Sequence, residues 1–209
     1  MQFCQKHYIH LLSDEIYACS VFDSGGADAT PFTSVLSIDP EGLIDTNLVH
    51  VIYGMSKDFG VAGLRVGALI SRNKALQEAV NSVIRFQNPS GASLAIGSVM
   101  LEDRTWCRSF INLSRQRLAE AYKLVTAKLE EIGIPYFRGV NAGFFVWIDL
   151  SHHLPRQLDG EANREFALAK RLKEAGVFLH PKEEHAIEPG WFRVVYTQDP
   201  RIVIEGLRR

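Results

Sequence analysis

Apolar residues form short continuous runs in the first third of the chain and recur at helical spacing after residue 73. Residues 8–12 and 48–53 are two apolar runs, the second rich in β-branched side chains, and such runs are typical of strands covered on both faces. A third run covers residues 65–70. The stretch from Tyr53 to Gly67 holds four glycines and one lysine, Lys57, so the pattern predicts a strand, a tight loop and a strand.

Three helices are predicted next, because apolar residues recur every three or four positions. Asn73 is the expected cap of the first helix, which ends at the Asn-Pro pair 88–89, and Ser90 begins the second, which reaches about Glu102. The third helix is the longest periodic segment, residues 104–132. At 1.5 Å per residue it is roughly 40 Å long, enough to cross from one domain to another.

After residue 133 the pattern changes to short strands and single amphipathic helices. We expect helices at 161–175 and 200–207, and strands at 144–148, 177–179 and 191–196. This mixture predicts a small α+β domain for the last part of the chain.

Composition and charge then exclude several classes of function. The 209 residues are 46% hydrophobic and 22% charged, as in a globular protein with a sizeable core. A net charge of -1 predicts no nucleic-acid partner, and apolar runs far below the roughly 18 residues of a membrane span predict no membrane segment. Three widely spaced cysteines favour a reducing compartment, so we expect a cytoplasmic location.

Candidate chemistry centres on Lys57, which follows one predicted strand, and on Asp14, which follows another. Ligands gather at the carboxyl ends of strands in open α/β sheets, so the two side chains are expected at one edge. Taken singly, a lysine is most often a solvated surface group and an aspartate after a strand is usually a turn former. A lysine that loses charge through desolvation becomes a nucleophile toward a carbonyl.

Further polar residues complete a set that suits one kind of cofactor. A pyridine bearing an aldehyde and a phosphate needs an amine, an acid partner for the ring nitrogen, a donor for the ring hydroxyl, and donors with positive charge for the phosphate. The chain offers the pairs Asp14 with Tyr17 and Ser56 with Lys57, and the arginines Arg65 and Arg193.

A rival metal motif is also present at residues 180–185, with the sequence His-Pro-Lys-Glu-Glu-His. It has one residue too many between the histidines for the inverted zinc-protease signature, and its proline opposes a helix. We therefore predict no metal site.

Four separated motifs resemble the class I/II aminotransferase family of pyridoxal-phosphate (PLP) enzymes, and most of all its 1-aminocyclopropane-1-carboxylate (ACC) synthase-like branch. They are DEIY at 14–17, SKDFG at 56–60 with GLRVG at 63–67, NAGFFVWID at 141–149, and EPGWFRV at 188–194. The resemblance implies PLP-dependent transferase fold type I: an α/β large domain with a mostly parallel sheet and flanking helices, and a small α+β domain.

The resemblance also implies roles for the cofactor-binding residues. Lys57 would form the internal aldimine and then move protons at the substrate α-carbon. Asp14 would keep the ring nitrogen protonated, and Tyr17 would donate to the ring oxygen O3′, so that these three are the expected catalytic residues. Ser56 and Arg65 would hold the phosphate.

On the substrate side, the resemblance makes Arg193 the residue that binds the α-carboxylate in a bidentate pair. Asn141 and Gly143 would lie near the same carboxylate. The substrate is expected to be a small molecule, an α-amino acid.

Full-length members of the family are about twice as long, and the resemblance assigns this chain to their C-terminal half. Residues 1–115 would be the C-terminal part of the large PLP-binding domain, and residues 116–209 the small domain. The part without a counterpart supplies a glycine-containing phosphate loop, a ring-stacking aromatic residue, an asparagine near O3′ and a tyrosine offered across a dimer. A homodimer is expected for the full-length form.

Several functions fit this reading. The chain is expected to be a PLP-dependent enzyme, with transamination, ACC synthase-like γ-elimination and C–S lyase chemistry as alternative reactions. A truncated, catalytically incomplete fragment that keeps part of the cofactor site, or a non-catalytic interaction protein, is the alternative from another class.

Overall fold

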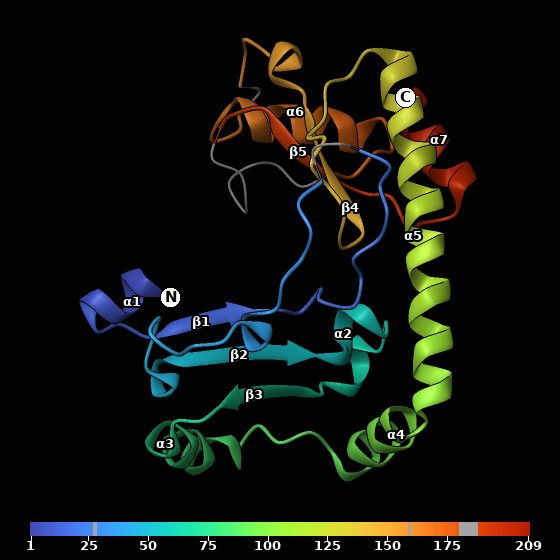
Figure 1. Ribbon diagram of the computed structural model, residues 1–209. Coiled ribbons are helices and arrows are strands. Elements are labelled where there is room, and N and C mark those ends of the chain that lie inside the picture. Colours follow the sequence, from blue (N-terminus) through green and yellow to red (C-terminus); the bar gives the residue numbers. More distant parts are fainter. Residues whose placement is uncertain (27–28, 159, 180–187) are drawn as a thin grey trace. The chain divides into compact units, whose positions relative to one another are not determined.

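The chain forms two compact units in the computed structural model (Figure 1), which describes residues 1–26, 29–158, 160–179 and 188–209. Unit 1 contains residues 1–21 and 31–114, and unit 2 contains residues 22–30 and 115–209. The short segment 22–30 thus belongs to the unit that is otherwise built from the second half of the chain.

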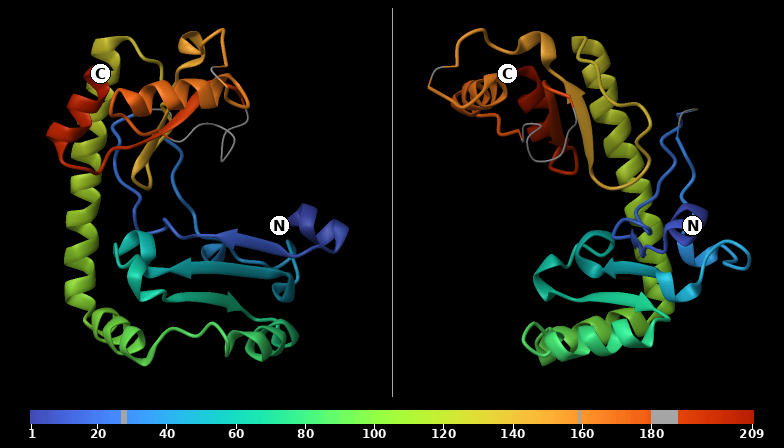
Figure 2. Two further views of the ribbon diagram at one scale, coloured as in Figure 1. Left: turned by 180° about the vertical axis from the view of Figure 1, so that it is seen from behind. Right: turned by 90° about the vertical axis from the view of Figure 1, so that its left-hand side faces the viewer.

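Unit 1 is built on a three-stranded sheet with the order β1-β2-β3, formed by Leu11–Asp14, Val49–Gly54 and Gly67–Ser71. β1 and β2 are parallel and β2 and β3 antiparallel, and Figure 2 shows the three strands side by side from two further directions. The first strand begins three residues later than predicted. A short helix, α1 (Gln2–His7), precedes it and ends at Tyr8 in a left-handed conformation with φ 52°.

The helices of unit 1 begin where the sequence predicts them. Asn73 caps α3 (Lys74–Ile84) by accepting from Leu76 N at 2.9 Å, and Ser90 caps α4 (Gly91–Glu102) by accepting from Ser93 N at 3.1 Å. These two predictions are confirmed. The remaining elements of unit 1 are α2 (Met55–Asp58), η1 (Val35–Ser37), η2 (Thr46–Leu48), η3 (Ala62–Leu64) and the first part of α5 (Arg104–Ile132).

The long helix α5 has the predicted bounds and contributes residues to both units. Its sequence alternates charged and apolar positions, and Gly133 follows it in the left-handed region with φ 73°. Among the described residues, no helix combines the length and the apolar character needed to cross a membrane.

Unit 2 pairs β4 (Phe145–Asp149) with β5 (Trp191–Val195) in an antiparallel ladder, accompanied by η4 (Ser151–His153), α6 (Arg164–Glu174) and α7 (Pro200–Arg208). The strand predicted at residues 177–179 is wrong. Val177 N instead donates to Leu172 O at 2.8 Å, and Gly176 has φ 83°, so this segment closes the C-terminus of α6.

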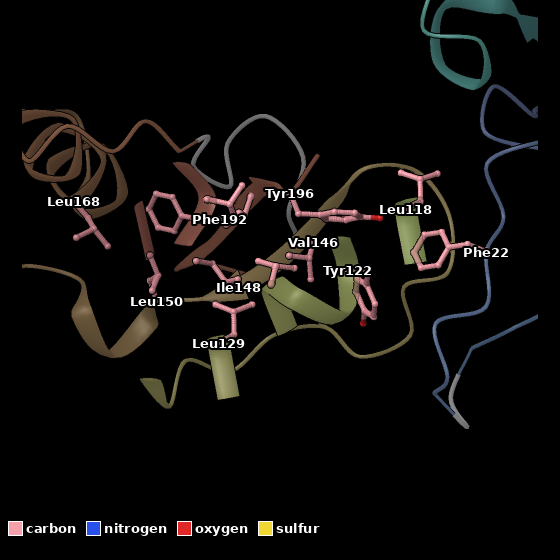
Figure 3. Close-up of a cluster of buried hydrophobic side chains, with 13 residues drawn as sticks. Phe22, Leu118, Tyr122, Leu129, Val146, Ile148, Leu150, Leu168, Phe192 and Tyr196 are labelled. Atoms are coloured by element: carbon pink, nitrogen blue, oxygen red, sulfur yellow. The ribbon is translucent and has the colours of Figure 1, made fainter. Parts of the chain in front are cut away.

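The core of unit 2 follows from alternation along the two strands. Val146 and Ile148 on β4 are fully buried, as is Phe192 on β5, while their sequence neighbours face the other way. The buried residues of α5 include Val125 and Leu129, both with no exposed surface. Figure 3 shows Leu129 beneath Ile148 within this cluster.

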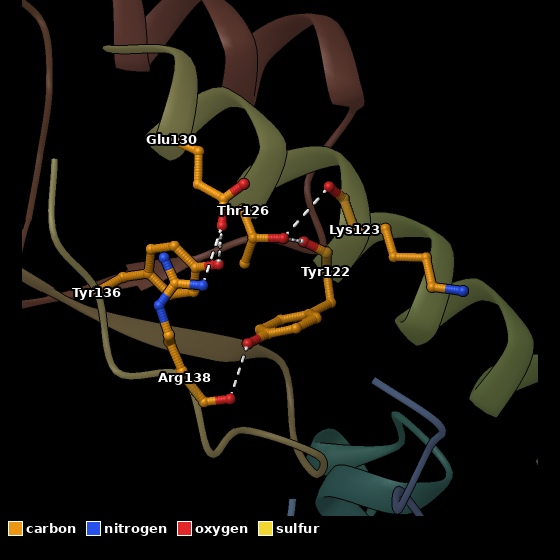
Figure 4. A network of polar contacts seen from close by, with 6 residues as sticks. All are labelled: Tyr122, Lys123, Thr126, Glu130, Tyr136 and Arg138. Atoms are coloured by element: carbon orange, nitrogen blue, oxygen red, sulfur yellow. Dashed lines mark hydrogen bonds and ion pairs between the residues drawn. The ribbon is translucent and has the colours of Figure 1, made fainter. Parts of the chain in front are cut away.

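A polar network fixes the chain just after α5 against the helix (Figure 4). Tyr136 donates to Glu130 Oε1 at 2.8 Å, and Arg138 Nη1 lies 3.2 Å from the same oxygen. Partial burial, followed by the bond to Glu130, raises the pKa of Tyr136 above its usual value. Because Glu130 and Arg138 are exposed, their ion pair contributes little stability, and the network mainly sets the path of residues 134–138.

The core predicts a clear contrast between two leucines of α5. Replacing Leu129, which is fully buried, by alanine should lower the free energy of unfolding by about 2–5 kcal/mol, since it leaves a cavity. Leu124→Ala is the matched control, because Leu124 is 40% exposed, and it should cost less than about 1 kcal/mol. Urea denaturation measures both changes, and equal losses would contradict this account of the core.

The turn before β5 predicts a second contrast, between two glycines. A Cβ at Gly190, where φ is 95°, would lie 2.5 Å from Ser151 Cα, so Gly190→Ala should destabilise the protein by about 2–3 kcal/mol or more. Gly206 in α7 has open space around it, and Gly206→Ala should stabilise by about 0.5–1 kcal/mol. Thermal unfolding distinguishes the two, and a neutral Gly190→Ala variant would refute the steric argument.

Candidate functional site

Asp14 and Lys57 follow two adjacent parallel strands. Asp14 lies opposite Ile52 in the register, and Glu15 N donates to Ile52 O at 2.9 Å, so β1 and β2 end at the same edge. Figure 1 shows α2 at the end toward which both arrows point. Because Lys57 is the third residue of α2, the structure brings the predicted amine and carboxylate to this shared edge, as the sequence patterns indicate.

The candidate cofactor residues differ in their exposure and in their hydrogen bonds. The side chains of Asp14, Lys57 and Arg65 are exposed, whereas Tyr17 and Ser56 are half-buried. Asp14 Oδ1 accepts from Ile16 N at 3.2 Å, which is the turn-forming role that its position after a strand allows. Solvent therefore reaches both the amine and the carboxylate.

Arg65 has an uncommon backbone conformation for a residue with a side chain. It ends η3 with φ 54°, in the left-handed region, and its Nη1 donates to Ala62 O at 3.2 Å. Non-glycine residues in this region are uncommon and cluster at functional sites. Arg65 shares this conformation with Tyr8, which likewise ends a helix.

A buried carboxylate that the sequence patterns did not single out joins the two segments. Asp58, the last residue of α2, is 2% exposed and accepts from Cys19 N at 2.9 Å. It also accepts from the Ser20 hydroxyl and, at 3.0 Å, from the Tyr53 hydroxyl. The chain that follows β1 is thereby bonded to the helix that carries the lysine.

Tyr53 is held as a hydrogen-bond donor at this position. Burial, and after it the negative charge of Asp58, raises the pKa of Tyr53 far above its usual value. The phenol therefore keeps its proton at neutral pH and continues to donate to the carboxylate.

Apolar packing and a glycine also hold α2. The ring of Phe59 stacks on Trp106 and Phe110 at centroid distances of 6.3 and 5.8 Å. A Cβ at Gly54, just before the helix, would lie 3.1 Å from Ile16 Cδ1 and 3.3 Å from a backbone oxygen. The strand end therefore approaches the chain after β1 closely, and only a residue without a side chain fits without displacement.

The glutamate of the DEIY motif also has a structural role that the sequence did not predict. Glu15 is 6% exposed and accepts from Ser34 Oγ at 2.6 Å and from Val35 N at 2.9 Å. It thus ties the segment around η1 to the end of β1.

Arg193 lies in unit 2, on the face of β5 that points away from the core. Its cross-strand partner is Trp147, and its guanidinium carbon lies 5.3 Å from the centroid of the Phe145 ring. Its Nε atom is buried and has no hydrogen-bond partner among the described residues. The Phe145 ring thus packs against the Arg193 guanidinium, whose Nε–H can still donate a hydrogen bond.

Asn141 is engaged in holding the chain of unit 2. Its Nδ2 donates to Thr30 O at 2.7 Å, and its backbone oxygen accepts from Phe22 N at 2.8 Å. Gly143 O accepts from the buried hydroxyl of Tyr196 at 2.8 Å. The two residues expected near the substrate carboxylate therefore have clear structural contacts.

The rival metal motif at residues 180–185 lies outside the described residues. Within the described ranges, no three His, Cys, Asp or Glu side chains gather closely enough to hold a metal ion.

Comparison with known proteins identifies the relatives of the chain. Residues 1–207 match the family model for aminotransferase class I and II. The human 1-aminocyclopropane-1-carboxylate synthase-like protein 1 is 35% identical over 210 residues, which are 99% of this chain and 40% of that protein. The rice 1-aminocyclopropane-1-carboxylate synthase 6 is 33% identical over 214 residues and is 38% covered.

Solved structures share the fold over almost the whole chain. The Thermus thermophilus aspartate aminotransferase with maleate has a TM-score of 0.78 at 20% identity, with 97% of this chain and 48% of that chain covered. An aromatic aminotransferase from Pyrococcus horikoshii has a TM-score of 0.79 at 20% identity, with 99% and 51% covered. These likenesses confirm the predicted fold class, PLP-dependent transferase fold type I.

The chain spans about 40% of the length of the curated relatives and about half of the solved chains. PLP is the cofactor of the enzymes in this family. Since the family model covers nearly every residue, the chain belongs to the class I and II aminotransferases.

Proposed function

We propose that the chain provides the lysine and much of the cofactor-binding surface of a PLP-dependent enzyme that acts on α-amino acids. The observation that carries this proposal is the parallel register of β1 and β2. Because of it, Asp14 and the helix α2, which contains Lys57, lie at the same edge of the sheet. We further propose that residues 1–115 belong to a PLP-binding domain and residues 116–209 to a small domain.

The residues present fit the cofactor in chemical type. Lys57 supplies an amine for an aldehyde, and Asp14 supplies a carboxylate for a protonated ring nitrogen. The hydroxyl of Ser56 and the exposed guanidinium of Arg65 supply the donors and positive charge that a phosphate needs. The buried Nε of Arg193, unpartnered among the described residues, supports a carboxylate ligand at that position.

When bound, PLP supplies an aldehyde that condenses with amines and a ring that stabilises negative charge at the substrate α-carbon. In our proposal, Lys57 binds the aldehyde carbon and later moves the proton at the α-carbon. Asp14 holds the proton on the ring nitrogen, and Tyr17 donates to the ring oxygen. Ser56 and Arg65 bind the phosphate.

The substrate is bound through its carboxylate in this proposal. Arg193 presents a planar fork that matches a carboxylate in a bidentate pair, and the ring of Phe145 supports the guanidinium from one side. The Asn141 Nδ2 group carries two hydrogens, one of which is bonded to Thr30 O, so that the other would donate to the carboxylate.

The names of the relatives favour two reactions for this scaffold. Curated relatives are ACC synthases and synthase-like proteins, and the structural neighbours are aspartate and aromatic aminotransferases. We propose transamination or ACC synthase-like elimination, with C–S cleavage as an alternative, because all three begin by removing the α-proton. A homodimer is proposed for the full-length form.

A second candidate is cofactor binding without turnover. It is favoured by one mouse relative, named a probable inactive 1-aminocyclopropane-1-carboxylate synthase-like protein 2, which is 35% identical over 199 residues. In this second candidate function the chain binds PLP through Lys57 but does not turn over a substrate.

The first test concerns Lys57. The purified chain mixed with PLP should develop a visible absorption band, and borohydride should fix the cofactor to a peptide that contains Lys57. Lys57→Ala should abolish both signals, since no amine remains to bind the aldehyde. Absorption spectra and peptide mass spectrometry measure these outcomes.

Lys74→Ala is the matched control, because Lys74 is another exposed lysine of unit 1. It should leave the band unchanged. Cofactor fixed elsewhere than Lys57, or no band in the unmodified chain, would refute the proposed cofactor site. A band without turnover of any α-amino acid would support the second candidate.

The next test concerns Arg193. Arg193→Lys keeps the charge and loses the planar fork, so the affinity of the PLP-loaded protein for an α-amino acid should fall about 10–100-fold. The affinity for PLP itself should stay unchanged. Titration of the visible band with amino acid measures the effect, with the exposed Arg208→Lys as control. An unchanged amino-acid affinity would show that Arg193 does not bind the carboxylate.

A further inference from the structure

Asp58 connects the two chain segments that carry the proposed cofactor residues of unit 1. Its buried carboxylate bonds to three donors on two segments: Cys19 N and the Ser20 hydroxyl after β1, and the Tyr53 hydroxyl at the end of β2. Burying a carboxylate is unfavourable unless such donors replace the water that it loses.

The two segments joined by Asp58 are the ones that carry the proposed catalytic groups. Asp58 follows Lys57 directly in α2, and Cys19 lies two residues after Tyr17. Ser20 N donates to Tyr17 O at 2.9 Å, so residues 17–20 form a closed turn. A shift of Cys19 and Ser20 would therefore also shift Tyr17.

We propose that Asp58 is a positioning residue, which holds the turn of Tyr17 in register with Lys57 so that the phenol and the amine engage one bound cofactor. This inference rests on the proposed function. Asp58 itself contacts neither substrate nor cofactor in this proposal. It acts only through the turn and through α2.

The chemistry of the three donors explains why an aspartate fits here. A carboxylate accepts at both oxygens, and each of its three partners can donate an N–H or O–H. An asparagine has the same shape, but one of its two oxygens is replaced by an NH2 group. That group donates, so it cannot accept from the Cys19 N–H or from the hydroxyls of Ser20 and Tyr53. Asp58→Asn therefore loosens the connection and changes the side-chain volume little.

The experiment is a double-mutant cycle on cofactor affinity. The dissociation constant for PLP is measured by absorbance for the unmodified chain, Asp58→Asn, Tyr17→Phe and the double variant. Each single change should weaken binding about 3–10-fold, the effect of one hydrogen bond. If Asp58 acts by positioning Tyr17, the double variant should bind PLP at most about twofold more weakly than the weaker-binding of the two single variants.

A purely structural role makes a different prediction. The two effects would then multiply, because a general loss of stability is independent of the Tyr17 hydroxyl. The control is Glu165→Gln in unit 2, where a buried carboxylate accepts from Gly190 N at 2.9 Å. It should lower the unfolding temperature and leave the affinity for PLP unchanged.

The possible outcomes separate this inference from the proposed function. Multiplying effects, or an Asp58→Asn variant with unchanged affinity, overturn the positioning role alone and leave cofactor binding intact. An unmodified chain that does not bind PLP overturns both. If Asp58→Asn does not fold, Ser20→Ala takes its place in the cycle, because it removes one of the three donors and keeps the carboxylate.

Discussion

The hydrogen bonds around the Asp58 carboxylate connect the two chain segments that carry the proposed cofactor residues. Parallel pairing of β1 with β2 brings the two strand ends to one edge, but it fixes only the backbone up to Asp14 and Gly54. Beyond the strands, few backbone hydrogen bonds connect the turn of residues 17–20 with the helix α2. Asp58 supplies the missing links through three donors, and the Phe59 ring holds the same helix from its apolar side.

In unit 2, the alternation along β5 separates the core residues from Arg193. Phe192 and Val194 point into the core, so Arg193 between them must point to the opposite face. There its guanidinium rests on the Phe145 ring, one position along β4 from the buried Val146. The same two strands thus build the core and present a charged fork, and a one-residue shift in register would exchange the two roles.

Sequence patterns predicted most helices well, because their signals are local. The caps Asn73 and Ser90 and the stop at Gly133 lie within a few residues of the ends that they mark. The strand predicted at 177–179 failed because Gly176 closes α6 with a turn, a bond pattern that apolar residues alone do not reveal. Asp58 was missed for the opposite reason: its partners Cys19 and Ser20 are 39 and 38 positions away. The motif residues carried the site prediction through resemblance, and their joint effect on one cofactor is still a proposal.

The distribution of these residues bears on which chemistry the chain can specify. Every reaction considered for this family begins with the α-proton, and the groups proposed for that step, Lys57, Asp14 and Tyr17, all lie in unit 1 within a few residues of β1 and β2. In our proposal their arrangement depends on strand register and on the Asp58 hydrogen bonds, neither of which involves the substrate side chain. Arg193 is proposed to bind a carboxylate, which every α-amino acid has. In this proposal the described residues serve the step that all α-amino acid substrates share, and groups that contact the substrate side chain would decide among transamination, elimination and C–S cleavage.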